Sequence, residues 1–148
     1  MAHIELDIES LAQSKLGTIT GIVYWRFDNE VFPDNCWSDL IVAVLAHWTD
    51  CALRIANGTS NKEGLRFMDG PYGIICTRQD IEAGLRCMKF TDIGAQVILE
   101  GTIPSREFTR QIRDSSQLVL RACEARGFAS KDLEVLRSAV ESLDQVIQ

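Results

Sequence analysis

The stretch FPDNCWSDLIVAVLAHWTDCALRI, residues 32–55, predicts a long amphipathic helix around which the rest of the chain packs. At ~100° per residue, its apolar side chains fall within an arc of roughly 140°. Asp39 and Asp50 lie on the opposite, solvent side. The apolar stripe has nine members: Trp37, Leu40, Ile41, Val44, Leu45, Trp48, Cys51, Ala52 and Ile55. Because two of the three tryptophans belong to it, this helix of about five turns is expected at the centre of the core.

Both ends of this helix carry local signals. Pro33 stops the preceding segment, and Asp34, Asn35 or Ser38 can supply an N-cap oxygen. At the other end, the pair at 57–58 is Asn-Gly, which tolerates the left-handed conformation that terminates helices.

Strand patterns occur on both sides of the helix. In residues 3–8 apolar and polar side chains alternate, and residues 18–27 are rich in β-branched and aromatic types. After the helix, four further strands are predicted at 65–68, 73–77, 85–90 and 95–102. Short turns cannot join parallel neighbours, so the sheet is expected to be mainly antiparallel.

From residue 105 the apolar period changes to that of a helix. Gly127 marks the end of a first helix, and Ser130 caps a second one. The short link predicts an antiparallel helical hairpin over residues 105–147. The chain is therefore expected to be a single α+β domain over residues 1–148. Its strands and central helix span 3–103, the long helix packs on a mainly antiparallel sheet, and the C-terminal helical hairpin follows.

The negative charge is unevenly placed. The net charge is −6, and residues 1–50 hold eight acidic and two basic side chains, whereas the remaining residues hold 13 of each. An acidic region of this kind repels nucleic acid and anionic membranes and favours a basic partner. A purely solubilising role for the charge is the alternative.

Several features predict a cytoplasmic protein. No apolar run reaches the ~18 residues needed to span a bilayer, and the acidic start MAHIELDIES does not resemble a signal peptide. The cysteines are odd in number and never spaced as CxxC, so free, mostly buried thiols are expected. They are Cys36, Cys51, Cys76, Cys87 and Cys123.

No set of residues predicts catalysis. His47 and Cys51 stand four apart on the helix, but a metal site needs further ligands and nothing local supplies them. Asp34, Asp39 and Asp50 fit helix-end and solvent-face roles better than acid–base work. The glycines form no phosphate-binding motif. We therefore predict no catalytic, cofactor-binding or metal-binding residue.

Two tyrosines are candidates for contact with a partner. The segment Asp69-Gly70-Pro71-Tyr72 reads as a turn, and Tyr72 at an exposed tip would suit an interface hot spot. Tyr24 lies on the strand face opposite Trp25, so one of the two is expected to be more exposed than the other.

Two segments resemble those of a known class of protein. Residues Phe32-Pro33, Trp37-Ser38-Asp39 and Trp48, followed by FMDGPY at 67–72, resemble elements of small cytoplasmic immunity proteins that accompany bacterial polymorphic toxins, including contact-dependent growth inhibition systems. The resemblance covers residues 17–78. It implies a non-enzymatic protein that binds and blocks one cognate toxin domain, and the acidic first third would suit a basic, nuclease-like toxin.

On this reading a set of residues from the first half of the chain is expected to contact the partner. These are Asp28, Glu30, Asp34, Asp39, Asp50, Tyr24 and Tyr72. Two other classes remain open: a regulatory or scaffold module that forms a homodimer or larger homo-oligomer through the C-terminal hairpin, and an enzyme acting on a small ligand.

Overall fold

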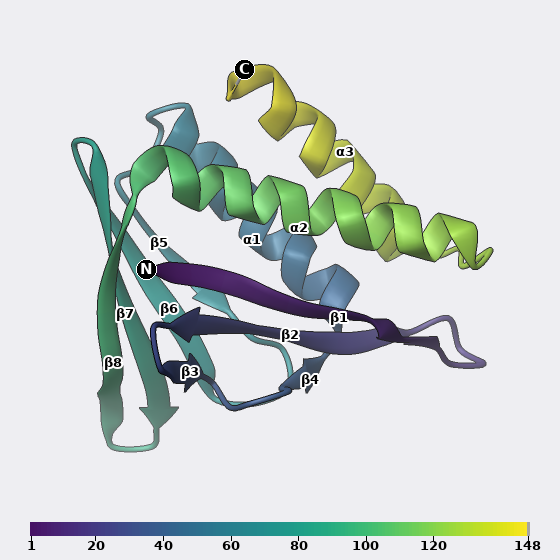
Figure 1. Ribbon diagram of the computed structural model, residues 1–148, viewed down its shortest axis with the longest axis horizontal. Coiled ribbons are helices and arrows are strands. Elements are labelled where there is room, and N and C mark those ends of the chain that lie inside the picture. The colour runs from purple at the N-terminus through teal and green to yellow at the C-terminus, as the bar shows by residue number, and fades with distance from the viewer. Residues whose placement is uncertain (148) are drawn as a thin grey trace.

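The computed structural model describes residues 1–147 as two four-stranded antiparallel sheets with three helices (Figure 1). The α+β class is confirmed. The elements, in chain order, are β1 (Ala2–Gln13), β2 (Ile19–Phe27), β3 (Glu30–Phe32), β4 (Ser38–Asp39), α1 (Ile41–Ala56), β5 (Lys62–Arg66), β6 (Tyr72–Gln79), β7 (Glu82–Thr91), β8 (Gly94–Pro104), α2 (Ser105–Ala125) and α3 (Lys131–Val146).

The strands divide between two sheets rather than forming one. In the first sheet β2 is central and pairs with β1, β3 and β4, whereas the second sheet is a meander in the order β5-β6-β7-β8. The short strands β3 and β4 were not predicted from the sequence, because two or three residues are too few to show an alternation of apolar and polar side chains. Each sheet is followed in the chain by a helix, α1 and α2 respectively.

The central helix begins later than predicted. Ser38 and Asp39 form β4 and pair with Ile22 and Gly21 of β2, so the helix starts at Ile41. Leu40 occupies the N-cap position and makes no side-chain capping bond. Trp37 thus precedes the helix, and the predicted capping by Asp34, Asn35 or Ser38 is wrong, because pairing with β2 outweighs the local capping signals.

The predicted C-terminal end of α1 is confirmed. The backbone N–H of Asn57 donates to the carbonyl of Leu53 at 2.9 Å, and Gly58 adopts a positive φ of 79°. No helix among residues 1–147 is long and apolar enough to cross a membrane.

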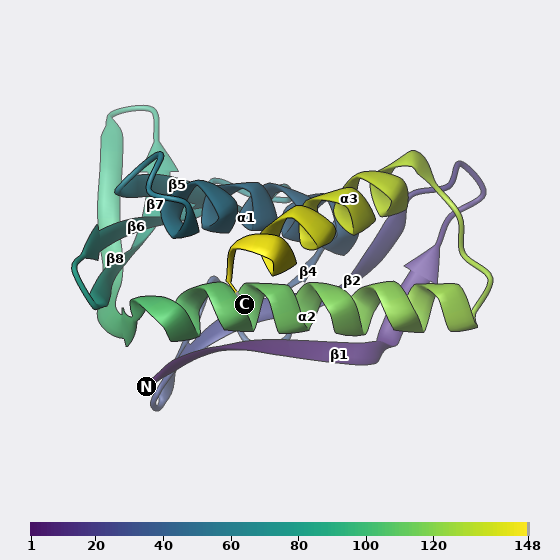
Figure 2. The same ribbon diagram turned by 90° about the horizontal axis from the view of Figure 1, so that it is seen from above.

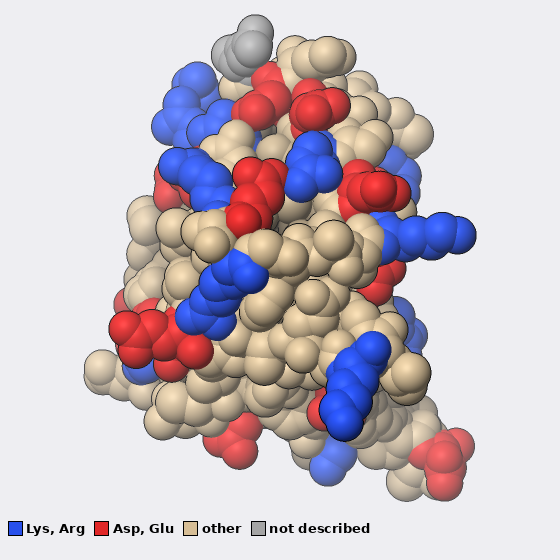
Figure 3. All heavy atoms as spheres, turned by 90° about the vertical axis from the view of Figure 1, so that its right-hand side faces the viewer, with Lys and Arg blue, Asp and Glu red and all other residues tan. Residues whose placement is uncertain are grey.

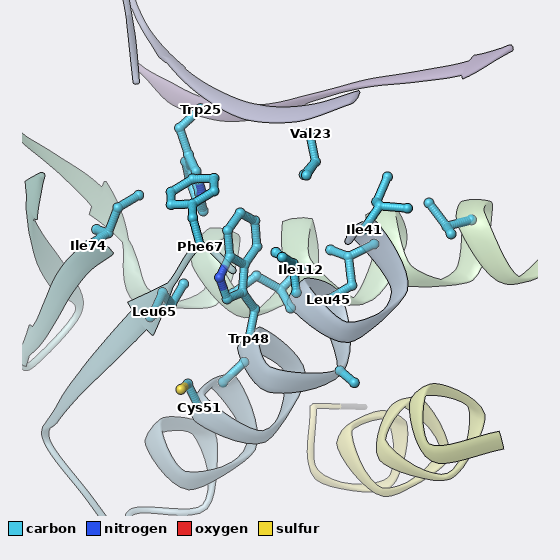
Figure 4. Close-up of a cluster of buried hydrophobic side chains, with 14 of the residues drawn as sticks. Val23, Trp25, Ile41, Leu45, Trp48, Cys51, Leu65, Phe67, Ile74 and Ile112 are labelled. Atoms are coloured by element: carbon cyan, nitrogen blue, oxygen red, sulfur yellow. The ribbon is translucent and has the colours of Figure 1, made fainter. Parts of the chain in front are cut away.

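The core lies where α1 meets both sheets. Trp48, fully buried on α1, packs edge-on against Phe67 with ring centroids 5.2 Å apart, and Trp25 of β2 lies 6.2 Å away (Figure 4). Trp25 also stacks on Phe108 of α2, at 6.2 Å and 18°. Aromatic residues from four parts of the chain therefore join the two sheets to the helices.

The two C-terminal helices form the predicted pair. Ser130 Oγ accepts the N–H of Leu133 at 3.1 Å, and Gly127, with a φ of 73°, ends the preceding helix. Viewed from above, α3 lies over α1 while α2 runs along β1 (Figure 2). Helix α3 packs more extensively on α1 than on α2, so the helix hairpin is part of the same core.

Candidate protein-binding surface

An acidic turn joins β2 to β3. Phe27 pairs with Glu30 across a two-residue turn, and Asp28 takes a positive φ of 55°, which Asp tolerates better than most residues. The Asp28 carboxylate is 83% exposed and accepts a hydrogen bond from the N-terminal ammonium of Met1 at 2.6 Å. That bond lowers the pKa of Asp28, so its carboxylate stays ionised.

This turn borders an open groove of about 350 Å³, here called the acidic groove. Its walls come from both sheets: Asp28 and Glu30 from the first, and Glu100 from β8 of the second. Glu100 lies 3.5 Å from Arg86, and both side chains are more than half exposed, so this ion pair is weak. The fold thus brings together carboxylates that stand 70 residues apart in the chain.

Strand β8 leads away from the groove as an edge strand. Within residues 1–147 it pairs only with β7, so the backbone groups of its outer edge are free. Val97 and Ile98 are 38% and 49% exposed, and Ile93 at the tip of the β7–β8 hairpin is fully exposed. An unpaired edge carrying exposed aliphatic side chains is a ready site for strand addition.

The structure removes Asp39 from the set of exposed acids. It is 2% exposed, and its carboxylate accepts the Nε1–H of Trp37 at 2.9 Å and the backbone N–H groups of Leu40 and Met68 at 2.7 and 3.1 Å. The prediction of a solvent-facing Asp39 is wrong. It assumed that the helix extended through residue 39, whereas pairing of β4 with β2 turns this carboxylate inward.

Neither tyrosine stands at an exposed tip. Tyr24 is 8% exposed, and Tyr72 is half-buried at the start of β6. The ring of Tyr72 meets Trp37 edge-on at 5.4 Å and Phe32 at 5.7 Å. The turn before it is exposed as predicted, but the aromatic ring stabilises the junction of the two sheets instead of facing outward.

Asp34 and Asp50 are exposed but lie apart from the acidic groove. Asp34 follows Pro33 in the loop before β4. Asp50 lines another groove, between α1 and α3, together with Glu134 and Val135. Moreover, acidic and basic side chains are interspersed on the face shown in Figure 3. Of the predicted acidic contact residues, Asp28 and Glu30 line the acidic groove, whereas Asp34 and Asp50 do not.

The pair His47 and Cys51 is held by local bonds. His47 Nε2 lies 3.0 Å from the carbonyl oxygen of Gly64 and 3.9 Å from Cys51 Sγ. Burial raises the pKa of Cys51 to about 12, so its thiol stays protonated at neutral pH. All five cysteines are free thiols, and all but Cys36 are buried. Among residues 1–147, no cluster of three or more His, Cys, Asp or Glu side chains could hold a metal ion.

Sequence reasoning found two of the three acids of the groove and missed Glu100. Glu100 and its neighbour Gly101 looked like ordinary positions of a strand. The one usable signal was Gly101, since a glycine inside a strand often marks a close approach of another segment.

Comparison with known proteins does not assign this chain to a family. No family model matches the sequence, and no curated protein matches it. A solved structure of Trypanosoma bruciei MRP1/MRP2 is similar at 14% identity over 88% of this chain and 87% of that chain, with a TM-score of 0.31. That score is too low to support a conclusion about fold or function.

Proposed function

We propose that this chain is a non-catalytic immunity protein that binds a basic toxin domain of the polymorphic-toxin class and blocks it. The observation that supports the proposal best is the convergence of Asp28, Glu30 and Glu100 at one open groove beside an unpaired strand edge.

The charge of the groove suits a basic partner. A nuclease must present a positive surface to hold phosphates, and three carboxylates in one groove attract such a surface. The groove also holds the Met1 ammonium, and Arg86 stands beside Glu100, so one negative charge remains uncompensated. Charge of this kind chiefly accelerates encounter and selects the partner, while apolar contacts supply much of the affinity.

Strand β8 supplies the apolar part of the same surface. Leu99 and Glu100 border the groove, and Val97 and Ile98 continue along the strand. An extended segment of the toxin that pairs with β8 would gain backbone hydrogen bonds and contacts to these side chains at once. The proposed interface therefore joins the acidic groove to the outer edge of β8.

A homo-oligomeric module is the second candidate, and the same edge supports it. Two copies of β8 could pair and continue the second sheet across a two-fold axis. The structure favours this route over the helical hairpin, because α3 already buries its apolar side against α1.

The test is co-expression with the toxin domain encoded next to this gene, followed by association kinetics at two salt concentrations. Asp28→Lys combined with Glu30→Lys should slow association and reduce its salt dependence. The matched control, Asp50→Lys with Glu134→Lys, reverses two charges in the other groove and should leave kinetics unchanged. A wild-type chain that neither binds nor protects cells would refute the proposal, and dimers in light scattering would then support the second candidate.

A further inference from the structure

A cavity of about 200 Å³ lies where the start of α2 meets the ends of α1 and α3, and it is lined by cations. Arg78 of β6 and Arg106 and Arg110 of α2 form its polar wall. Among residues 1–147, no acidic residue lines it, although the chain as a whole carries a net charge of −6. This cavity, here called the arginine cavity, is therefore positively charged in a protein whose net charge is negative.

Arg78 is held in place without losing its charge. Its Nη1 donates to the carbonyl of Ile55 at 3.0 Å, and its Nε donates to the carbonyl of Asp80 at 3.2 Å. Both acceptors are backbone carbonyls without formal charge, so they orient the guanidinium and leave it ionised. The Ile55 carbonyl belongs to the C-terminal turn of α1, whose dipole offsets part of the positive charge. A cation fixed in this way loses little conformational freedom when it binds an anion.

Arg106 and Arg110 stand one turn apart on the same side of α2. Among residues 1–147, the ion pairs of α2 involve Arg113, Asp114 and Glu124, and neither Arg106 nor Arg110 takes part in one. Like charges at this spacing destabilise a helix. An anion placed between the two guanidinium groups would turn that repulsion into attraction.

The first turn of α2 adds positive charge on the same side. The N–H and Oγ–H groups of Ser105 are used, donating to the carbonyls of Ile81 and Asp80. Pro104, at the N-cap position, makes no side-chain bond to the amides that follow. Glu107 in the first turn already offsets part of the positive end of this 21-residue helix, so the helix dipole makes a smaller contribution than the arginines.

We propose that the arginine cavity binds the phosphate group of a small ligand. The planar guanidinium fork matches phosphate oxygens in pairs, and three such groups can offset a dianion. Pockets for drug-sized ligands measure roughly 300–1,000 Å³. A volume of about 200 Å³ fits phosphate or a small phosphomonoester, with Ile55 and Val146 available as an apolar wall.

Calorimetric titration of the full chain tests the proposal, with inorganic phosphate in one arm and phenyl phosphate in the other. Arg106→Gln and Arg110→Gln should each weaken binding ~10-fold, the scale of one charge-assisted contact. Arg121→Gln is the matched control: it removes an exposed arginine from the same helix but lies outside the cavity, and binding should change less than ~2-fold. Thermal melts check that each variant remains folded.

The two titrations distinguish free phosphate from a phosphomonoester as the ligand. Equal binding of the two probes shows that the cavity recognises the phosphate group alone, as it would in free phosphate, whereas tighter binding of phenyl phosphate favours a phosphomonoester. Binding of neither probe, or an equal loss in Arg121→Gln, would overturn the proposal. The arginine cavity and the acidic groove share no residue, so toxin binding is decided separately.

Discussion

The ring of Phe27 lies so close to the backbone of Gly101 that a Cβ on residue 101 would stand 2.7 Å from Phe27 Cδ2. Phe27 ends β2 of the first sheet, and Gly101 belongs to β8 of the second, so this contact sets how closely the two sheets approach. Both residues also line the acidic groove. The absence of a side chain at Gly101 thus allows the two sheets to approach closely enough for Asp28 and Glu100 to line the same groove.

Gly101→Ala should destabilise the protein by about 1–3 kcal/mol, because the added methyl group must displace a large ring in a tight contact. Gly84→Ala is the matched control in the same sheet. A Cβ there would meet nothing nearer than the carbonyl oxygen of Thr77 at 3.9 Å, so a change below about 0.5 kcal/mol is expected. Denaturant melts measure both, and equal effects would contradict this account of the sheet junction.

Asp39→Ala should cost about 3 kcal/mol or more of unfolding free energy. It leaves the indole N–H of Trp37 and two backbone N–H groups without their acceptor near the protein interior, and each buried unpaired donor costs about 1–3 kcal/mol. Asp34→Ala removes an exposed acid five residues earlier and should change stability by less than about 0.5 kcal/mol. If Asp39→Ala lowers the unfolding free energy in urea by less than about 1 kcal/mol, the three hydrogen bonds to this carboxylate do not contribute as stated.

Trp48→Ala should destabilise the fold by about 3–5 kcal/mol, because a fully buried ring leaves a cavity and the carbonyl of Arg66 loses the Nε1–H donor at 2.9 Å. Asp50→Ala, on the exposed side of the same helix, should cost less than about 0.5 kcal/mol. Thermal unfolding of the two variants compares the buried and exposed faces of α1. Similar losses of stability in both variants would contradict the assignment of Trp48 to the buried face and Asp50 to the exposed face.

The pair Glu63 and Arg54 should make stability depend on acid pH. Their atoms lie 2.7 Å apart, and the hydrogen bond from Arg54 holds the pKa of Glu63 below its ordinary 4.5. A lowered carboxyl pKa stabilises the fold above the ordinary pKa, and that contribution is lost as the pH falls through the lowered value. Arg54 is partly exposed, so the contribution is about 0.5–1 kcal/mol.

Glu63→Gln provides the comparison. The gap between wild type and this variant should be constant above pH ~5 and should close below pH ~4.5 as the Glu63 carboxyl protonates. Unfolding free energies measured across this range give the result. A gap that persists unchanged well below that range would show that the charge of Glu63 is not its cause.

Ile98→Lys should weaken toxin binding by increasing the dissociation rate, because it places a charge on the apolar edge of β8 while leaving the acidic groove intact. Val135→Lys is the control: it adds the same charge at an exposed aliphatic position on α3. Surface plasmon resonance with the toxin domain distinguishes the two. Unchanged dissociation in Ile98→Lys would place the interface elsewhere than β8.

The sequence by itself determined the elements whose signals are local. The apolar stripe through Trp48, the Ser130 cap and the Gly127 stop all act within about one or two helical turns, so neighbouring residues suffice to predict them. Three strands of the second sheet contain the residues predicted for them, for the same reason, whereas β5 begins at Lys62, three residues before the predicted 65–68, and ends at Arg66. The exposed acidic turn at Asp28 and Glu30 likewise follows from its residue types.

Only the tertiary structure decided which residues meet across the chain. Pairing of Asp39 with Gly21 shortened the central helix and buried a carboxylate that the helical period places outside. The close contact of Phe27 with Gly101 brought Glu100 to the acidic turn. Such contacts depend on packing between segments tens of residues apart, and their energy outweighs the small local preferences of capping and period.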